Sequence, residues 1–241
     1  MQIVSFIVIA FNVWMLIDAA RRRAEFWWFL VIVFLPLGGL VYFVIVKLQD
    51  YDLSGLRRAF SGGTGPASIT KLSYRAQETP SISNKLALAE ALSGVERYGE
   101  AADVYREVLR TDRDNKQSLH GLARSLLGAG KSTDACEHLQ RLLEMDNSYG
   151  DYGAALDYAE ALWQSGQRDD AIDLLQGLVG ISSRINHRVA LAHYLIQAGR
   201  SAPARDALDL ALRDYEHSPA FVKNRDKKWA ERASKMLREL G

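Results

Sequence analysis

Cysteine is almost absent from this sequence, and neither sign of charge dominates it. The single Cys136 excludes a disulfide within the chain and any Cys-x-x-Cys metal or redox site. The net charge is +1 overall, and residues 82–215 carry fifteen Lys and Arg against twenty Asp and Glu, a net charge of −5. Because a nucleic-acid-binding surface is strongly basic, a nucleic-acid partner is not expected.

The sequence also lacks the short motifs of catalysis. It contains no Gly-x-Ser-x-Gly elbow, no His-Glu-x-x-His helix and no phosphate-binding loop. The glycine-rich stretch SGGTGPAS has neither a preceding strand nor a Gly-Lys-Ser/Thr ending, so we interpret it as a flexible linker. We therefore expect no catalytic residue, no metal ligand, no cofactor and no enzyme activity.

Two long apolar runs lie near the N-terminus. Residues 26–46 hold no charged side chain over 21 positions, and a transmembrane helix needs about 20 apolar residues. Residues 3–17 form a shorter run, and the start MQIVSF lacks the Lys or Arg that begins a signal peptide. These features predict an uncleaved transmembrane hairpin over residues 1–47, which turns at DAARRRAE.

The predicted hairpin resembles a known membrane anchor. The run WMLIDAARRRAEFWWFLVIVFLPLGGLVYFVIVKL is similar to the N-terminal hairpin of cardiolipin synthases in the phospholipase D superfamily. In that family a later domain with His-x-Lys motifs performs catalysis, and no histidine of this chain has a lysine two residues on. The resemblance implies an anchor that contacts membrane lipid, without the enzyme's activity.

Residues 48–81 are expected to join the hairpin to the rest of the chain. Leu53, Leu56 and Phe60 recur at helical spacing beside two arginines, which is typical of a short helix lying on the membrane surface. The glycine-rich stretch follows. This segment is therefore predicted to be a juxtamembrane helix and a flexible linker, and a fragment that begins near Ile82 is predicted to be soluble, monomeric and helical.

A repeated pair of helices is the main feature of residues 82–215. The same local pattern returns after 34, 36 and 33 residues at four alanines: Ala101, Ala135, Ala171 and Ala204. Four units accordingly begin at Ile82, Lys116, Tyr152 and Ile185. A period in the low thirties with two helices per unit is typical of a stacked solenoid. The predicted fold class is all-α, with a transmembrane hairpin followed by an α-solenoid of four repeats.

This pattern resembles the tetratricopeptide repeat. Arrays of that family bind extended peptides or partner helices in a concave groove lined by the first helix of each unit, so the resemblance implies such a groove here. The candidate lining residues are Leu86, Glu90, Ser93, His120, Arg124, Leu127, Leu156, Glu160, Trp163, Asn186, Val189, His193, Ile196 and Gln197. The family's carboxylate clamp of Lys, Asn and Arg is not expected, because its positions hold Leu86, Glu90, Gly121, Gly153 and Asp157.

Trp163 is the expected anchor of this groove. The repeat register places it on the concave side of the third unit, near Leu156 and Ile196, and a large aromatic side chain there has the makeup of a binding hot spot. The alternative is that its ring packs on a neighbouring repeat. Glu90 and Glu160 add negative charge, so the expected partner segment carries an aliphatic or aromatic anchor and at least one basic residue.

Residues 216–241 are predicted to form a basic amphipathic helix that caps the solenoid. Terminal repeats need such a helix to cover the last apolar face. The apolar side includes Phe221, Trp229 and Met236, and seven Lys and Arg occupy the rest. Contact of the basic side with anionic lipid is compatible with capping, so both interpretations stay open.

The sequence favours a membrane-anchored scaffold that binds a protein or peptide partner. The alternative is an extracytoplasmic assembly chaperone similar to the tetratricopeptide subunits of cytochrome c maturation, and a lipid-modifying enzyme is not expected. The expected location is the bacterial cytoplasmic membrane. Arg21, Arg22 and Arg23 on the hairpin loop balance Lys47, Arg57 and Arg58 beyond it, so the positive-inside rule does not select the side of the repeats.

Overall fold

The computed structural model describes residues 66–240, and this part of the chain forms helices and no strand. The helices are α5 (Pro66–Glu78), α6 (Ile82–Gly94), α7 (Tyr98–Thr111), α8 (Lys116–Gly128), α9 (Ser132–Met145), α10 (Gly153–Gln164), α11 (Arg168–Ile181), α12 (Ile185–Gln197), α13 (Ser201–His217) and α14 (Ala220–Leu240). None of these described helices is long and apolar enough to span a membrane. The predicted hairpin of residues 1–47 lies outside the described residues.

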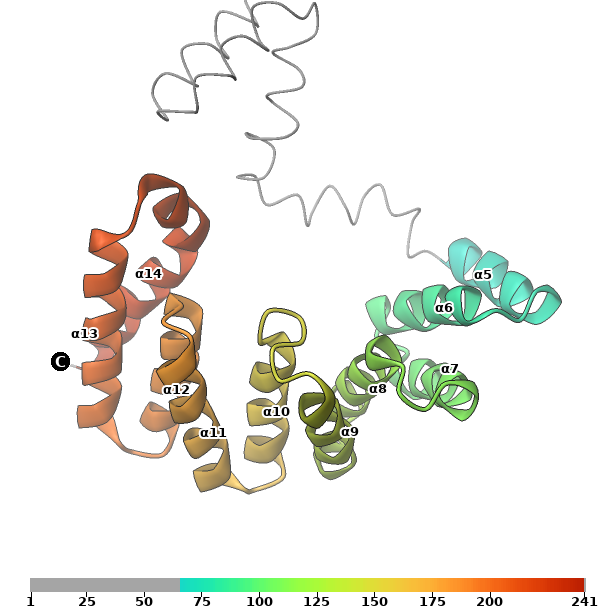
Figure 1. The fold of residues 1–241 in the computed structure, drawn as a ribbon, viewed down its shortest axis with the longest axis horizontal. Coiled ribbons are helices and arrows are strands. Elements are labelled where there is room, and N and C mark those ends of the chain that lie inside the picture. The colour runs from blue at the N-terminus through green and yellow to red at the C-terminus, as the bar shows by residue number, and fades with distance from the viewer. Residues whose placement is uncertain (1–65, 241) are drawn as a thin grey trace, which may run out of the picture. The chain divides into compact units, whose positions relative to one another are not determined.

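The described helices stack as an arc of antiparallel pairs. Figure 1 shows α6, α8, α10 and α12 along the inner side of the arc and α7, α9, α11 and α13 along its outer side. The first helices of the four predicted units begin at Ile82, Lys116, Gly153 and Ile185, within one residue of the predicted starts. The prediction of an all-helical solenoid is therefore confirmed for this part of the chain.

The turn inside each helix pair has one repeated geometry. It closes with a backbone hydrogen bond of 2.8–3.0 Å from the N–H of Arg97, Lys131, Gln167 and Arg200 to the carbonyl of Leu92, Leu126, Leu162 and Leu195. The residue before each donor has a positive φ, which suits Gly130, Gly166 and Gly199. In the first turn this residue is Glu96, at φ 62°. A left-handed conformation costs a non-glycine residue about 1–2 kcal/mol, so the first turn is the least favourable of the four.

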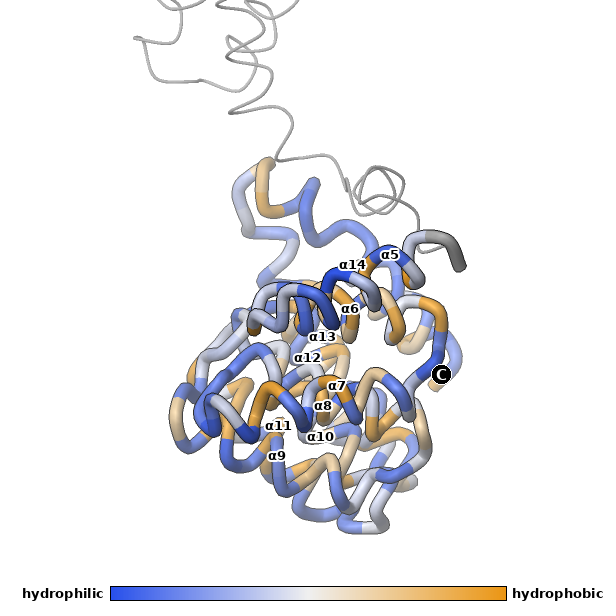
Figure 2. Tube along the Cα trace, turned by 90° about the vertical axis from the view of Figure 1, so that its right-hand side faces the viewer, coloured by the Kyte–Doolittle hydropathy of each residue, from blue (hydrophilic) through white to orange (hydrophobic). Residues whose placement is uncertain are grey.

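Small residues allow the helices of each pair to approach closely. Alanines recur at two positions of every unit and are all fully buried: Ala89, Ala101, Ala123, Ala135, Ala159, Ala171, Ala192 and Ala204. Leucines such as Leu126, Leu139 and Leu175 fill the space between them. Figure 2 shows hydrophobic and hydrophilic stretches alternating along the helices, as expected when each helix buries one face.

Helix α5 is a difference from the sequence analysis, which assigned residues 66–78 to the flexible linker. These residues form a helix packed on α6. Its side chains Ile69 and Ala76 are 7% and 8% exposed and belong to the same core cluster as Leu88 and Leu92 of α6. Helix α5 therefore belongs to the described helical body, and a fragment that starts at Ile82 would uncover the face of α6 on which it packs.

Helix α14 covers the other end of the described arc. It packs on α12 and α13 and buries Ala230, Ala233 and Met236. Trp229 is half-buried against the same core, with the Lys228 and Arg232 cations 5.7 and 5.8 Å from its ring centroid. Phe221, which the sequence analysis placed on the apolar face, is 63% exposed instead, because it lies in the first turn of α14 before the helix reaches the core.

His187 is a buried histidine whose protonation is expected to oppose folding. Its side chain is fully buried in α12 beside Tyr152, with ring centroids 5.8 Å apart, and neither ring nitrogen has a well-formed hydrogen bond within residues 66–240. Burial, followed by the charge of Arg184, lowers the pKa of His187, and the Ser182 backbone opposes this shift only weakly. The native state therefore favours the neutral imidazole.

We expect stability to fall as the pH drops below the unfolded-state pKa of about 6.5, because the unfolded chain then binds the proton more readily. His187→Leu should flatten the loss of unfolding free energy between about pH 7 and pH 5. Urea denaturation at several pH values measures this, with the exposed His217→Leu as control. Burial also lowers the pKa of His138 and His193. These two histidines should therefore leave some pH dependence of the unfolding free energy in His187→Leu. If the unfolding free energy of His187→Leu fell with pH as steeply as that of wild type, His187 would not be the cause of the loss.

Candidate partner-binding groove

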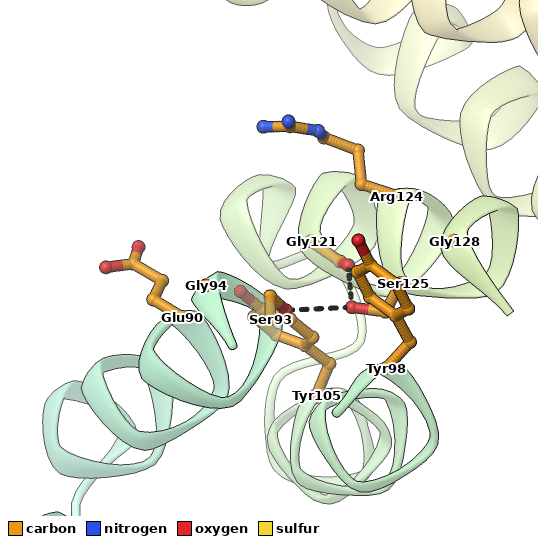
Figure 3. Close-up of a pocket in the computed structure, with 9 residues that line it drawn as sticks. All are labelled: Glu90, Ser93, Gly94, Tyr98, Tyr105, Gly121, Arg124, Ser125 and Gly128. Carbon is orange, nitrogen blue, oxygen red and sulfur yellow. Dashed lines mark hydrogen bonds between the residues drawn. The ribbon is translucent and has the colours of Figure 1, made fainter. Parts of the chain in front are cut away.

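The inner side of the arc contains a cavity of about 360 Å³ between α6 and α8. It is lined by Glu90, Ser93, Gly94, Tyr98, Tyr105, Gly121, Arg124, Ser125 and Gly128. Figure 3 shows the two tyrosines rising from α7 between the inner helices, while Glu90 and Arg124 extend outward. The cavity thus has an aromatic floor and a charged rim.

Two glycines of α8 make room for the two tyrosine rings. A Cβ added at Gly121 would lie 2.3 Å from Cζ of Tyr105, and one added at Gly128 would lie 2.7 Å from the ring of Tyr98. Such distances do not occur between real side chains, so each ring occupies the space that a larger residue would fill. The pairs are one heptad apart on each helix, which places both contacts on the same face.

Hydroxyl groups form a chain of hydrogen bonds across this floor. Ser125 Oγ donates to the Gly121 carbonyl at 2.8 Å, and Ser93 Oγ lies 3.1 Å from Ser125 Oγ. Because Ser125 gives its one proton to the Gly121 carbonyl, Ser93 is the donor of the Ser93–Ser125 hydrogen bond. Burial, followed by the nearby charge of Glu90, raises the pKa of Tyr105 to about 12. The floor is therefore polar and uncharged.

The rim carries groups of both signs. Glu90 Oε1 accepts a hydrogen bond of 2.7 Å from Nε2 of Gln117, which lies on α8. Farther along the arc, Asp157 of α10 lies 2.7 Å from His120 Nε2 and 3.7 Å from Arg124 Nε. Glu90 has no ion-pair partner among the described residues. It is therefore the carboxylate best placed to meet a cation from another molecule.

An aromatic wall continues the groove toward the C-terminus. The Trp163 ring of α10 lies 5.0 Å from the Tyr194 ring of α12, and the Arg168 guanidinium lies 5.1 Å from the Trp163 centroid. Burial, then Glu160, then Asp157 raise the pKa of Tyr194 to about 12. Trp163 thus packs on the next unit, which is the alternative that the sequence analysis left open.

The structure distributes the predicted groove residues among three environments. Four are exposed: Glu90, Arg124, Glu160 and Gln197. Nine are half-buried: Leu86, Ser93, His120, Leu127, Leu156, Trp163, Asn186, His193 and Ile196. Val189 is 1% exposed in the core of α12, so it offers no surface to a partner and its prediction as a lining residue is corrected. Its apolar side chain is buried because α12 packs against three helices, α11, α13 and α14.

The comparisons with known proteins agree with this geometry. Residues 86–117 and residues 120–184 each match a family model described as tetratricopeptide repeat. These two parts of the chain are therefore similar to tetratricopeptide repeats. The matched residues include most of α6 and α8, which form the cavity, and all of α10, which carries Trp163. No curated protein matches the sequence.

Solved tetratricopeptide structures share this fold at low identity. A thermophilic repeat protein of Thermus thermophilus is 18% identical with a TM-score of 0.52, over 78% of this chain and 98% of that chain. A MamA RS-1 double mutant is 15% identical with a TM-score of 0.57, over 72% and 98%. YrrB, a tetratricopeptide protein with an unusual peptide-binding site, is 17% identical with a TM-score of 0.50, over 70% and 90%. These likenesses show the fold alone.

The repeat pattern does not reveal the cavity floor. Tyr105 falls at a repeat position that otherwise holds leucine, which is typical of the core, and the pattern does not single out Tyr98, Ser125 or Gly128. A signal was present, since Tyr98 and Tyr105 are seven residues apart on one helix and Gly121 and Gly128 are seven apart on the next. Paired bulky and small residues at matching intervals indicate helices that fit into each other.

Replacing Trp163 by alanine is expected to destabilise the array by about 2 kcal/mol, because the ring loses its contact with Tyr194 and the Arg168 cation. Urea denaturation of Trp163→Ala, compared with the exposed neighbour Gln164→Ala, measures this. The control should change stability by less than about 0.5 kcal/mol. Equal stability of the two variants would show that the Trp163 ring lies free in the groove.

Proposed function

We propose that this protein is a membrane-tethered scaffold whose concave groove binds an extended segment of a partner protein. The observation that carries the proposal is the cavity between α6 and α8, which lies on the inner side of the arc. Its volume of about 360 Å³ is within the range of small binding pockets. YrrB, which has a similar fold, is a tetratricopeptide protein with an unusual peptide-binding site. A peptide is therefore the proposed type of ligand.

The charges of the groove favour a basic residue in the partner. Glu90 stands at the cavity rim without an ion pair in residues 66–240, and Glu160 is exposed on the same side of α10. Arg124 is the one cation of the cavity lining, and its Nε lies 3.7 Å from Asp157, a third carboxylate on this side. A lysine or arginine over Glu90 would form a charge-assisted hydrogen bond, while an apolar side chain would pack on the aromatic wall at Trp163.

Peptide selection tests this function. A random peptide library screened against the purified protein should yield peptides that combine Lys or Arg with an aliphatic or aromatic residue. Their affinity, measured by calorimetry, should fall about tenfold or more in Glu90→Lys/Glu160→Lys, because attraction becomes repulsion. Asp173→Lys, a charge reversal at an exposed residue of outer helix α11, should leave the affinity unchanged. Acidic peptides, or equal losses in both variants, would contradict the proposal.

The tether is a separate part of the proposal and rests on the uncharged run of residues 26–46. We propose that residues 1–47 anchor the scaffold in the bacterial cytoplasmic membrane. Alkaline carbonate should then leave the full-length protein in the membrane pellet, and its release would refute the anchor. A cysteine placed in residues 62–65 of a Cys136→Ser protein, labelled in intact cells with an impermeant thiol reagent, reports which side the repeats face.

A further inference from the structure

A second cleft lies on the outer side of the arc, away from the groove. It has a volume of about 490 Å³ and is formed where α7 and α9 flank α8. Its lining residues are Arg106, Leu109, Arg110, Arg113, Leu119, Leu122, His138 and Arg141. We call this set the outer cleft. It concentrates four arginines in an array of repeats whose net charge is negative.

Two of the four guanidinium groups are free to bind a ligand. Arg106 pairs with Asp103 at 2.8 Å and Arg141 pairs with Asp114 at 2.7 Å. Arg110 and Arg113 are exposed and make no side-chain hydrogen bond or ion pair within residues 66–240. Asp103 and Asp114 are 75% and 70% exposed, and such exposed ion pairs are weak. A ligand carboxylate could therefore also displace them from Arg106 and Arg141.

The base of the outer cleft is apolar. Leu109 of α7 is half-buried and supplies the accessible apolar surface, while Leu119 and Leu122 of α8 also line the cleft but are each only 1% exposed. A ligand that fits must therefore place an apolar group at the base and negative groups at the arginine rim. Inorganic phosphate matches the rim alone and leaves the base uncovered.

The arginines of the outer cleft do not recur at the equivalent positions of the next unit. The next unit carries Gln140, Glu144 and Asn147 where the first carries Arg106, Arg110 and Arg113. Gly177 stands where the outer cleft has Arg141. The solenoid can thus be built without these arginines, and their grouping is not a requirement of the fold.

We propose that the outer cleft is a second binding site, which takes an acidic peptide segment with one aliphatic side chain. The half-buried Leu109 contacts the aliphatic side chain, and Arg110 and Arg113 form charge-assisted hydrogen bonds with carboxylates on either side of it. A nucleic acid is disfavoured because residues 82–215 carry a net charge of −5. A bilayer surface is disfavoured because the apolar base is recessed in a cleft between helices.

A fluorescein-labelled peptide Glu-Glu-Leu-Glu-Glu provides the probe, and fluorescence anisotropy with the full-length protein in mild detergent provides the measurement. Affinity should fall about tenfold in Arg110→Gln/Arg113→Gln and should also fall as salt screens the charges. Arg213→Gln is the matched control, since Arg213 occupies the same repeat position as Arg110 on exposed α13. Replacing the probe leucine by serine should weaken binding several-fold while changing nothing in the protein.

Three results would overturn the proposal: no binding of the probe, equal binding by wild type and the double variant, or displacement of the probe by glycerophosphoglycerol, which would identify a lipid headgroup as the ligand. Failure of the groove proposal is distinguishable from failure here. Glu90→Lys/Glu160→Lys changes the inner side alone, so it should leave the affinity for the acidic probe within about twofold of wild type.

Discussion

Gly121→Ala is expected to destabilise the array by about 1–2 kcal/mol, although alanine is the better helix former by about 1 kcal/mol. The new methyl group would lie 2.3 Å from Cζ of Tyr105, whose ring is 3% exposed and would have to leave its packed position. The displaced ring would also disturb the hydrogen bond between Ser93 and Ser125, which line the same cavity. Thermal and urea denaturation measure the change.

The array itself offers the control and the rescue for this prediction. Gly177 lies inside α11 with nothing within 4 Å of its added Cβ, so Gly177→Ala should stabilise by up to about 1 kcal/mol. In the third and fourth units the equivalents of Tyr105 and Gly121 are Leu175 and Ala190. Tyr105→Leu combined with Gly121→Ala should therefore be more stable than the sum of the single changes implies. Stabilisation by Gly121→Ala alone would contradict the packing described.

Ile69→Asp is expected to detach α5 and reduce the free energy of unfolding by about 3 kcal/mol. Ile69 is 7% exposed against the core that includes Leu88 and Leu92, and a carboxylate there would be buried without a partner. The helix would undock rather than bury the charge, so hydrogen exchange should accelerate across residues 66–78. Urea denaturation gives the loss of stability.

Lys71→Asp is the matched control for α5, because this exposed residue lies two positions away on the same helix. The free energy of unfolding of Lys71→Asp should stay within about 0.5 kcal/mol of the wild-type value. If both aspartate variants behave alike, α5 does not belong to the helical body, and the boundary near Ile82 inferred from the sequence is restored.

The repeat architecture could be predicted because it depends on spacing. Alanines at Ala101, Ala135, Ala171 and Ala204 mark helix crossings that tolerate no larger side chain, and all four are fully buried. Glycines with positive φ mark three of the turns, whose backbone conformation excludes most other residues. Such positions are dictated by local geometry, so the sequence alone reveals them.

The α5 helix and the cavity floor depend on tertiary contacts that spacing does not encode. Ile69, Leu72 and Ala76 follow a helical period, but the adjoining glycines indicated a linker, and only packing against α6 decides between the two. Likewise Tyr105 is a core residue at one end of its ring and a cavity floor at its hydroxyl. The position of Tyr105 in the repeat predicts that its ring is buried, but it does not predict that its hydroxyl lines a cavity.

Site-specific photo-crosslinking in native cells tests the concave groove most directly. A photoreactive amino acid at Gln117 or Gln197 samples the first helices of the array, and one at Gln176 or Asp209 samples exposed positions on outer helices α11 and α13. The groove account predicts a crosslinked partner from Gln117 and Gln197, lost in Glu90→Lys/Glu160→Lys, and none from the outer positions. Crosslinks from Gln176 and Asp209 alone would contradict it.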